Sequence, residues 1–209
     1  MCFSSDNQPV YITKRFDIGE NGEKYRQEDF CSIVGRSEIV SGSNFKYNGS
    51  YEEMAIVIRK YVASWPLAME RFFKLLIFNY IFANGDAHLK NFSLLYKAGE
   101  VQLAPAYDLI NTAVHVNDGD FGMDGGLSPR LERSDSYYAT GHPCQIDFQR
   151  FGKLIGLHDT CIDNILKQFL SFPDEVERLI FDSFLNDDST KRKYLKIIEE
   201  RRMRFVREK

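Results

Sequence analysis

The chain has 209 residues, of which 44% are hydrophobic and 14% aromatic, a composition that supports one hydrophobic core and argues against a disordered polypeptide. The formal net charge of −3 gives no general reason to expect a nucleic acid or an anionic membrane as a partner. The four cysteines form no C-x-x-C pair and charges interrupt every apolar stretch, so we expect a cytoplasmic domain without disulfides or a membrane span.

The N-terminal part of the chain is predicted to form one strand and one short helix. Residues 9–17, PVYITKRFD, alternate in polarity and are rich in β-formers, which predicts a strand. After a run of turn residues, residues 25–35 predict a short helix that ends at a glycine. Residues 36–49 show no clear period and predict an irregular connection.

Two longer helices are expected next. The first begins after Ser50, the predicted N-cap, and Glu53 stands at the right spacing to complete a capping box. The second begins at Pro66, where proline is best tolerated, and is apolar nearly all round, so we expect it at the centre of the fold. It is predicted to stop at Asn84-Gly85, a pair that favours leaving helical geometry.

The second half predicts a hairpin, a long irregular segment and further helices. Residues 92–96 and 101–105 read as two strands joined by KAGE. Residues 114–144 are rich in Gly, Asp and Ser without a period, and so long a segment is usually functional or disordered. Residues 145–209 predict several helices, and the basic stretch 191–209 is interpreted as the solvated face of the last one. The expected fold class is therefore mainly α with a small β element.

Polar residues gather where the central helix ends, in NGDAHLKNFSLLY, residues 84–96. Asp86 and Asn91 have the spacing D-x-x-x-x-N, and Asp108 follows just past the hairpin. Phosphoryl transfer needs a carboxylate near the incoming hydroxyl and oxygen ligands for magnesium, and protein kinases use an Asp, an Asn and a later Asp for these roles. Each residue alone is also typical of a turn or a cap, so spacing leaves both interpretations open.

Several stretches together resemble one known family. QEDFCSIVG, NGDAHLKNFSLLY and LAPAYDLINT are similar to the C-terminal kinase domain of HipA-type serine/threonine kinases, the toxins of bacterial toxin–antitoxin pairs. TKRFD resembles the hinge segment R-F-D-R of the same family, with Ile18 in place of the second arginine. The resemblance runs from Tyr11 to Thr112 and continues more loosely after Gln145. It implies a protein-kinase-like C-lobe, with ATP and Mg²⁺ as cofactors.

Carried over position by position, the resemblance implies a role for each residue of the polar loop. Asp86 would be the catalytic base, and Asn91 and Asp108 would hold magnesium. His88 and Lys90 would line the phosphate region.

The resemblance also implies a nucleotide-binding set near the hinge. Phe16 and the backbone of Lys14 and Arg15 would meet the adenine, with Tyr107 on the other side of the nucleotide. Asp17 would approach the ribose. A further family signature, which we interpret as structural support, lies at Gln27, Glu28 and Asp29.

The family pattern predicts a single domain in four parts. These are a hinge strand (1–17), a catalytic core (18–113), a substrate or activation-like loop (114–144) and C-terminal helices (145–209). Family members carry a Gly-rich phosphate loop and a strand lysine before the hinge, and the residues before the hinge contain neither. We therefore expect a split kinase whose N-lobe is a separate polypeptide that docks on the hinge strand.

Two alternatives remain open. The chain could be a catalytically inactive HipA-like binding module or remnant that sequesters an antitoxin or another DNA-binding partner. GDAHLKN also resembles the G-D-x-H-x-x-N loop of aminoglycoside and choline phosphotransferases, which act on small molecules. For a protein kinase, the family implies a protein substrate such as an aminoacyl-tRNA synthetase. From the charge and the apolar pattern we expect no direct contact with nucleic acid or membrane. We expect the isolated chain to be weakly active or inactive.

Overall fold

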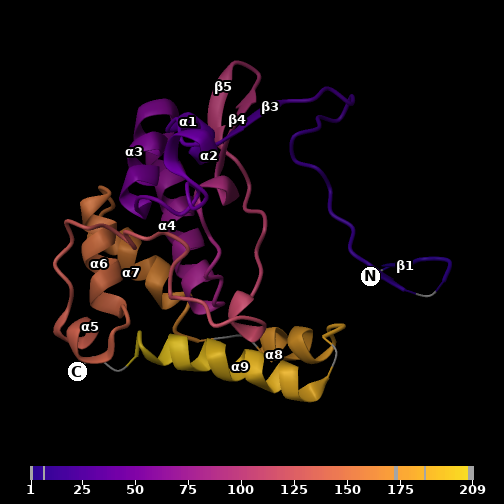
Figure 1. Ribbon diagram of the computed structural model, residues 1–209, viewed down its shortest axis with the longest axis vertical. Coiled ribbons are helices and arrows are strands. Elements are labelled where there is room, and N and C mark those ends of the chain that lie inside the picture. Colours follow the sequence, from indigo (N-terminus) through magenta and orange to yellow (C-terminus); the bar gives the residue numbers. More distant parts are fainter. Residues whose placement is uncertain (1, 7, 172–173, 186, 207–209) are drawn as a thin grey trace.

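The computed structural model describes residues 2–6, 8–171, 174–185 and 187–206. Within these ranges the chain is mainly helical with a small antiparallel sheet at one end, as the sequence predicts (Figure 1). The longer helices are α3 (Tyr51–Tyr61), α4 (Trp65–Ile81), α6 (Gln145–Leu154), α7 (Asp159–Lys167), α8 (Asp174–Phe181) and α9 (Asp188–Met203). The shorter helices are α1 (Phe30–Ile33), α2 (Glu38–Ser41), α5 (Asp135–Thr140) and the 3₁₀ turns η1 (Leu89–Asn91) and η2 (Thr112–Val114).

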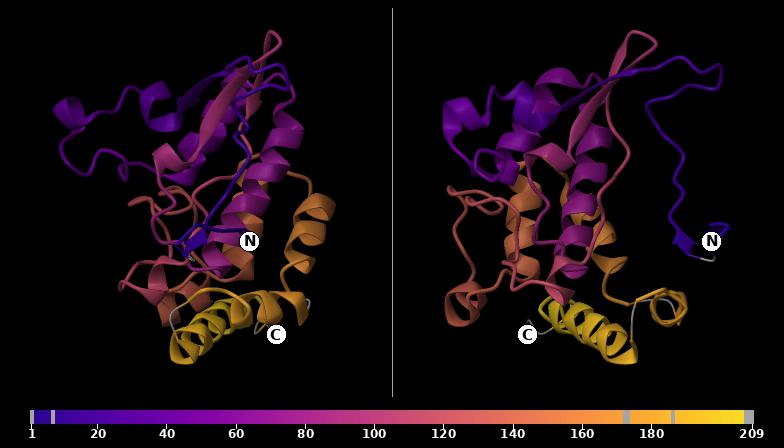
Figure 2. Two further views of the ribbon diagram at one scale, coloured as in Figure 1. Left: turned by 90° about the vertical axis from the view of Figure 1, so that its right-hand side faces the viewer. Right: turned by 45° about the vertical axis from the view of Figure 1, so that its right-hand side comes forward.

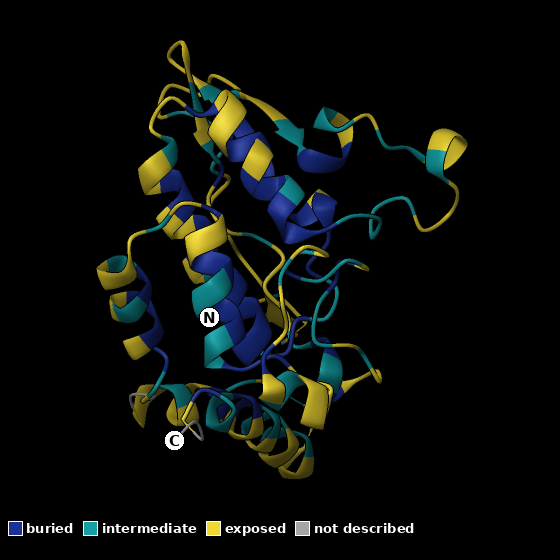
Figure 3. Cartoon of the chain, turned by 90° about the vertical axis from the view of Figure 1, so that its left-hand side faces the viewer, coloured by how far each residue is buried: buried dark blue, intermediate teal, exposed yellow. Residues whose placement is uncertain are grey.

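Helix α4 is the central element, as its apolar sequence predicts. Its side chains Met69, Phe72, Phe73 and Ile77 are fully buried. The helix contacts α3, α7 and α9, and the buried surfaces of these elements face one another (Figure 3). Helices α8 and α9 lie across the end of the molecule opposite the sheet (Figures 1 and 2). The C-terminal end of α4 is therefore enclosed, and the loop that follows it begins on a rigid base.

The sheet contains three strands in the order β3 (Arg26–Asp29), β4 (Ser93–Lys97) and β5 (Glu100–Leu103). The predicted hairpin of β4 and β5 is confirmed, with Ala98 and Gly99 both at positive φ in its turn. The prediction of helix over 25–35 is wrong for its first part, because β3 pairs antiparallel with β4. Strand pairing with a neighbour overrides the local helical preference, and α1 starts only after Asp29, which caps it.

The predicted strand over residues 9–17 is mostly wrong. Only β2 (Pro9–Val10) is a strand, and it pairs with β1 (Cys2–Phe3). The residues that follow are extended but have no neighbouring strand in the described part of the chain, and Tyr11 is 89% exposed. The alternating pattern correctly indicates extended backbone, but a strand also needs a partner. This segment lies to one side of the helical body in Figure 1.

The start of α3 is built differently from the prediction. Ser50 is the N-cap, but its side chain forms no cap hydrogen bond, and Glu53 pairs with Arg36 at 2.8 Å instead of closing a capping box. The first backbone N–H groups of α3 donate to the carbonyls of Gly126 and Leu127. The long segment 114–144 therefore caps this helix with its own backbone.

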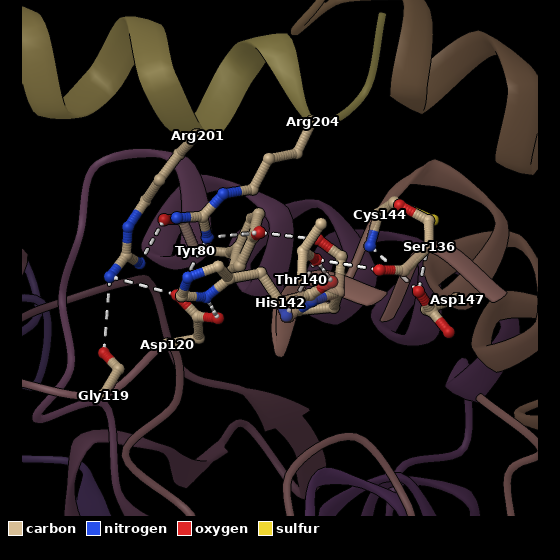
Figure 4. Close-up of polar contacts among 11 residues, drawn as sticks. Tyr80, Gly119, Asp120, Ser136, Thr140, His142, Cys144, Asp147, Arg201 and Arg204 are labelled. Atoms are coloured by element: carbon tan, nitrogen blue, oxygen red, sulfur yellow. Dashed lines mark hydrogen bonds and ion pairs between the residues drawn. The ribbon is translucent and has the colours of Figure 1, made fainter. Parts of the chain in front are cut away.

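Helix α9 is more than a solvated basic face, contrary to the sequence interpretation. Arg201 is 6% exposed and donates to the Tyr80 carbonyl at 2.7 Å (Figure 4). Arg201 and Arg204 both pair with Asp120, which His142 also contacts at 2.7 Å. Buried charges need such partners, and these contacts attach α9 to α4 and to the segment 114–144. Residues 207–209 of the predicted basic stretch lie outside the described residues.

The helices predicted after residue 145 are confirmed as α6 to α9. Helix α6 begins at Gln145, where the predicted helical region begins, and Asp147 at its third helical position accepts from the Cys144 N–H at 2.9 Å. None of the described helices combines the length and the apolar character that crossing a bilayer requires.

Candidate active site

The loop with the predicted base leaves α4 through a left-handed turn at Ala83, whose φ is 57°. The sequence predicts this turn at Asn84-Gly85, one to two residues later. Instead Asn84 is buried, and its Nδ2 donates to Asn79 Oδ1 and to the Asp108 carbonyl, each at 3.1 Å. These bonds satisfy buried polar groups. A buried polar group left without a hydrogen-bond partner would cost about 1–3 kcal/mol. They hold the loop against both the helix and the segment around Asp108.

Thr112 fixes the other side of the same turn. Its Oγ1 accepts from the Gly85 N–H at 2.8 Å and donates to the Ala83 carbonyl at 3.1 Å. The Thr112 N–H also donates to the Ala83 carbonyl at 3.1 Å. The loop and the segment after the hairpin are thus joined by side-chain and backbone bonds from a residue that the sequence did not single out.

Asp86 lies in this loop with one carboxylate oxygen engaged. Its Oδ1 accepts from the Tyr47 hydroxyl at 2.7 Å. Lys46 Nζ lies 3.9 Å and His88 Nε2 3.8 Å from the same oxygen. The side chain is 36% exposed, and Oδ2 has no hydrogen-bond partner in the described part of the chain. Oδ2 is therefore the oxygen free to meet a ligand.

His88 is close to Asp86 but enclosed. Its side chain is 7% exposed, and Tyr47 packs against the ring at a centroid distance of 5.2 Å. Burial lowers the pKa of His88 below its ordinary value, although the Asp86 carboxylate opposes the shift. Nδ1 has no hydrogen-bond partner within the described residues. Burial therefore favours the neutral form of the imidazole.

The two predicted magnesium ligands come into contact. Asn91 Nδ2 donates to Asp108 Oδ2 at 2.5 Å, across the hairpin that separates them in the sequence. Asn91 Oδ1 accepts from the His88 N–H at 3.1 Å, and Asp108 has a left-handed backbone with φ of 56°. Non-glycine residues in that region often occur at functional sites, although aspartate tolerates it better than most.

The chemistry of this pair fits magnesium. An amide oxygen and a carboxylate are hard donors, and Mg²⁺ typically takes one or two protein ligands and completes its shell with water and phosphate oxygens. Among the described residues there is no group of three or more His, Cys, Asp or Glu side chains that could hold a metal. The pair Asn91–Asp108 therefore suits an ion that arrives with a nucleotide better than a resident metal.

The Lys90 side chain contacts Phe45 rather than Asp86. Its ammonium lies over the ring of Phe45 at 5.8 Å from the centroid, and no ion pair joins it to Asp86. Its carbonyl accepts from the Tyr107 hydroxyl at 2.8 Å. The side chain lines a different part of the site from the one that its sequence neighbours Asp86 and His88 occupy.

The predicted adenine-binding residues also meet. The rings of Phe16 and Tyr107 have centroids 5.8 Å apart and an interplanar angle of 30°. The Tyr107 hydroxyl lies 2.6 Å from Ser93 Oγ, which accepts from Gln27 Nε2 at 3.0 Å. Burial raises the pKa of Tyr107, so its hydroxyl stays protonated. Tyr107 is firmly positioned, whereas Phe16 comes from the extended N-terminal segment.

An open cavity of ≈ 610 Å³ lies beside Tyr107. This volume is within the usual range for small-molecule sites. Arg15 and Asp17 form an ion pair on its wall at 2.5 Å, and the hydrogen bond from Arg15 lowers the pKa of Asp17. Lys14 is exposed on the adjoining segment. Other residues that line the cavity are Lys24, Gln27, Asp29, Lys90 and Ser93.

The segment 114–144 approaches the polar loop closely. Gly122 lies so near the loop that a Cβ there would stand 2.6 Å from the Ala87 nitrogen, so only glycine fits. The Gly122 N–H donates to the hydroxyl of Tyr51, which donates to the Ala87 carbonyl at 2.8 Å. The backbone of this long segment is therefore part of the wall around the polar loop.

These features define a class: a kinase-like C-lobe, in which a loop after a central helix and an acid after a hairpin converge. The same fold occurs in a solved complex described as the Shewanella oneidensis MR-1 toxin–antitoxin system HipA, HipB and its operator DNA. The TM-score is 0.66 at 18% identity, over 92% of this chain and 48% of that chain. A likeness at this identity shows the fold alone.

The particular family follows from the sequence comparison. The family model described as HipA-like C-terminal domain matches residues 1–176, and the chain belongs to this family. A Haemophilus influenzae protein named "Putative kinase" is 25% identical over 187 residues, which are 84% of this chain and 54% of that protein. "Putative kinase Y4mE" of Sinorhizobium fredii is 27% identical over 118 residues, 54% of this chain and 27% of that protein. The chain thus spans about half the length of the first relative, and less of the second.

Proposed function

We propose that the chain is the catalytic half of a HipA-like serine/threonine protein kinase that transfers the γ-phosphate of ATP to a protein hydroxyl. The observation that carries this proposal is the contact between Asn91 and Asp108 beside the loop of Asp86. Asn91 and Asp108 come from two separate segments, Asn91 belongs to the same loop as Asp86, and kinase chemistry uses this combination of an amide and two carboxylates. Membership of the HipA-like family supports the same assignment.

Asp86 is the proposed catalytic base. Its Oδ1 is held by Tyr47, which leaves Oδ2 to accept the proton of the acceptor hydroxyl. The acceptor oxygen bonds to the γ-phosphorus while the bond from that phosphorus to the β–γ bridging oxygen breaks. ADP leaves with that electron pair, and the proton passes to Asp86.

Asn91 and Asp108 are the residues that would hold magnesium. A bound magnesium ion neutralises charge on the nucleotide phosphates. The chain supplies the rigid support: Asn91 Oδ1 is fixed by the His88 N–H, and the Asp108 carbonyl by Asn84. His88 and Lys90 border the phosphate region, His88 as a buried neutral ring and Lys90 from the cavity side.

The adenine is proposed to lie near Phe16 and Tyr107, with the backbone of Lys14 and Arg15 along its edge. The cavity beside Tyr107, with Asp17 on its wall, suits the ribose. In this arrangement the nucleotide extends from the N-terminal segment toward Asp86.

A Gly-rich phosphate loop and a phosphate-gripping strand lysine do not occur among residues 1–209. We propose that another polypeptide segment supplies them by docking along the extended N-terminal segment, where Tyr11 and Ile12 are 89% and 68% exposed. An N-lobe polypeptide that carries this segment and a DNA-binding antitoxin are the proposed partners. An aminoacyl-tRNA synthetase is the family-level expectation for the protein substrate.

Transfer of labelled γ-phosphate tests the proposal. The chain would be assayed alone and with the polypeptides encoded beside it, with protein acceptors and with aminoglycosides and choline. We expect protein phosphorylation that requires the complete pair and is lost in Asp86→Asn. Labelled small molecules would favour the small-molecule phosphotransferases instead. Absence of both transfer and nucleotide binding in every combination would leave only the non-enzymatic binding module.

A further inference from the structure

The segment 36–49 contributes two residues to the candidate active site that neither the sequence motifs nor the family comparison assigns. This segment projects from the fold around α2 (Figures 2 and 3). It is closed at its base by Arg36, which donates to the Asn48 carbonyl and pairs with Glu53 at 2.8 Å. The dipeptide Lys46-Tyr47 lies at this closed base, where the segment meets the loop of Asp86.

The backbone of the dipeptide is anchored on two sides. The Lys46 carbonyl accepts from the Leu89 N–H at 3.2 Å, inside the polar loop. The Tyr47 carbonyl accepts from the Asp124 N–H at 3.0 Å, in the segment 114–144. The two side chains therefore start from fixed points.

Both side chains converge on one carboxylate oxygen. The Tyr47 hydroxyl donates to Asp86 Oδ1 at 2.7 Å, and Lys46 Nζ lies 3.9 Å from the same atom. Lys46 Nζ also lies 4.7 Å from the centre of the Tyr47 ring. The Lys46 side chain is 31% exposed, so a ligand that approaches Asp86 can reach the ammonium.

The charge balance of the site gives this lysine a role. A nucleotide triphosphate would bring several negative charges to a site that already contains the carboxylates of Asp86 and Asp108. The enclosed His88 ring offers no accessible donor, since its side chain is 7% exposed, and Lys90 lies against Phe45. Within the described residues, Lys46 is the lysine or arginine that forms an ion pair with Asp86.

We propose that Lys46 binds the terminal phosphoryl group of the nucleotide and that Tyr47 positions Asp86 with its free oxygen toward the acceptor. The inference rests on the proposed kinase function and adds the groups at its γ-phosphate end. Tyr47 is a positioning residue, because it acts through Asp86. Lys46 touches the transferred group and therefore discriminates a triphosphate from a diphosphate.

Nucleotide affinity tests the role of Lys46 without relying on activity. Calorimetry would compare AMP-PNP and ADP binding, both with magnesium, for wild type, Lys46→Met and Lys46→Arg, alone and with the N-lobe polypeptide. A lost charge-assisted contact predicts about tenfold weaker AMP-PNP binding for Lys46→Met and ADP binding within about twofold of wild type. Lys46→Arg is expected to restore most of the difference. Equal losses for both nucleotides, or no loss for either, would overturn the assignment.

The chain offers a matched control for this variant. Lys60-Tyr61 is the same dipeptide on α3, with the ammonium 4.9 Å from the ring centre and no carboxylate paired with it among the residues that the structure describes. Lys60→Met is expected to leave both affinities unchanged. The melting temperature of each variant separates a loss of binding from a loss of folding. If Lys46→Met is unstable, the AMP-PNP and ADP affinities of Lys46→Arg test the assignment.

Kinetics test the role of Tyr47. Tyr47→Phe removes one hydroxyl and is expected to lower kcat about tenfold with KM for ATP and the melting temperature unchanged, whereas Tyr61→Phe changes none of them. If the wild-type chain neither binds a nucleotide nor transfers phosphate, the proposed function and this inference are both overturned. If the wild-type chain is active and Lys46→Met and Tyr47→Phe have its nucleotide affinities and kcat, this inference alone is overturned.

Discussion

The two ends of the candidate nucleotide site are held in very different ways. At the phosphate end, Asn84 and Asn91 are 4% and 8% exposed and are tied by side-chain bonds to α4 and to Asp108. At the adenine end, Phe16 lies in an extended segment, and the residue before it, Arg15, is exposed. A ring contact joins Phe16 to Tyr107. The proposed reactive groups are therefore supported by this chain's own core, while the proposed adenine end depends on a segment with few contacts.

This difference has a physical consequence for function. Catalytic groups need positions accurate to a fraction of an ångström, and buried hydrogen bonds provide that accuracy. A binding surface for a flat base tolerates a looser support, which a docked partner can complete. Substitutions at the phosphate end should therefore affect chemistry strongly, and those at the adenine end should affect affinity modestly.

The largest expected effect is that of Asp86→Asn. Removal of a general base costs about 10²–10⁴-fold in rate, and the isosteric amide leaves the fold intact. Labelled γ-phosphate transfer should fall by that factor while the melting temperature stays unchanged. Asp182→Asn, an exposed acid after α8, is the control that should behave as wild type. If Asp86→Asn retained full activity, the phosphate end would not be the catalytic end.

Asp108→Ala should act on magnesium-dependent nucleotide binding. Loss of one of the two protein oxygen ligands is expected to weaken the response to magnesium by at least about tenfold. Titration of magnesium at fixed AMP-PNP, followed by calorimetry, measures this. Equal magnesium responses for wild type, Asp108→Ala and Asn91→Ala would remove the pair from the metal site.

Thr112→Val probes the support of the phosphate end. It leaves the Gly85 N–H without its partner, and the free energy of unfolding in urea should fall by about 1–3 kcal/mol. Thr140→Val removes a hydroxyl from an exposed helix end and should cost less than about 0.5 kcal/mol. Similar costs at the two positions would contradict the view that the turn after α4 is held by this bond.

The smallest expected effect lies at the adenine end. Phe16→Ala removes one half-buried ring and should weaken ATP binding about fivefold, because a base–aromatic contact contributes about 1–3 kcal/mol and this one is partly open. Binding of inorganic tripolyphosphate should not change, since it has no base. Phe3→Ala, on the same segment but packed on Phe184, is the control. A parallel loss for ATP and tripolyphosphate would show that Phe16 supports the site in another way.

Much of the fold was predictable where one local pattern dominates. The apolar sequence of residues 65–81 determines helix α4 almost alone, and the turn residues Ala98-Gly99 do the same for the β4–β5 hairpin. Elements that depend on a distant partner were not predictable. Residues 26–29 become a strand because β4 lies beside them, and residues 11–15 do not because no described strand does.

The same distinction applies to the candidate site. The contact of Asn91 with Asp108 follows from a spacing that the sequence displays, although their metal-binding role remains a prediction. Lys46 and Tyr47 lie in an irregular segment about 40 residues before Asp86, with no motif to connect them. A hydrogen bond between two loops depends on how the core places them, and local sequence carries no signal for it.

The most direct test of the account is NMR shift mapping of magnesium AMP-PNP on the chain, which also detects weak binding. We expect one ligand to perturb both ends together: Phe16 and Tyr107 at the adenine end, and Asn91 and Asp108 at the phosphate end. Removal of magnesium should abolish the second group of shifts and leave the first. Shifts confined to another surface, or no shifts at millimolar nucleotide, would contradict the claim that these residues form one nucleotide site.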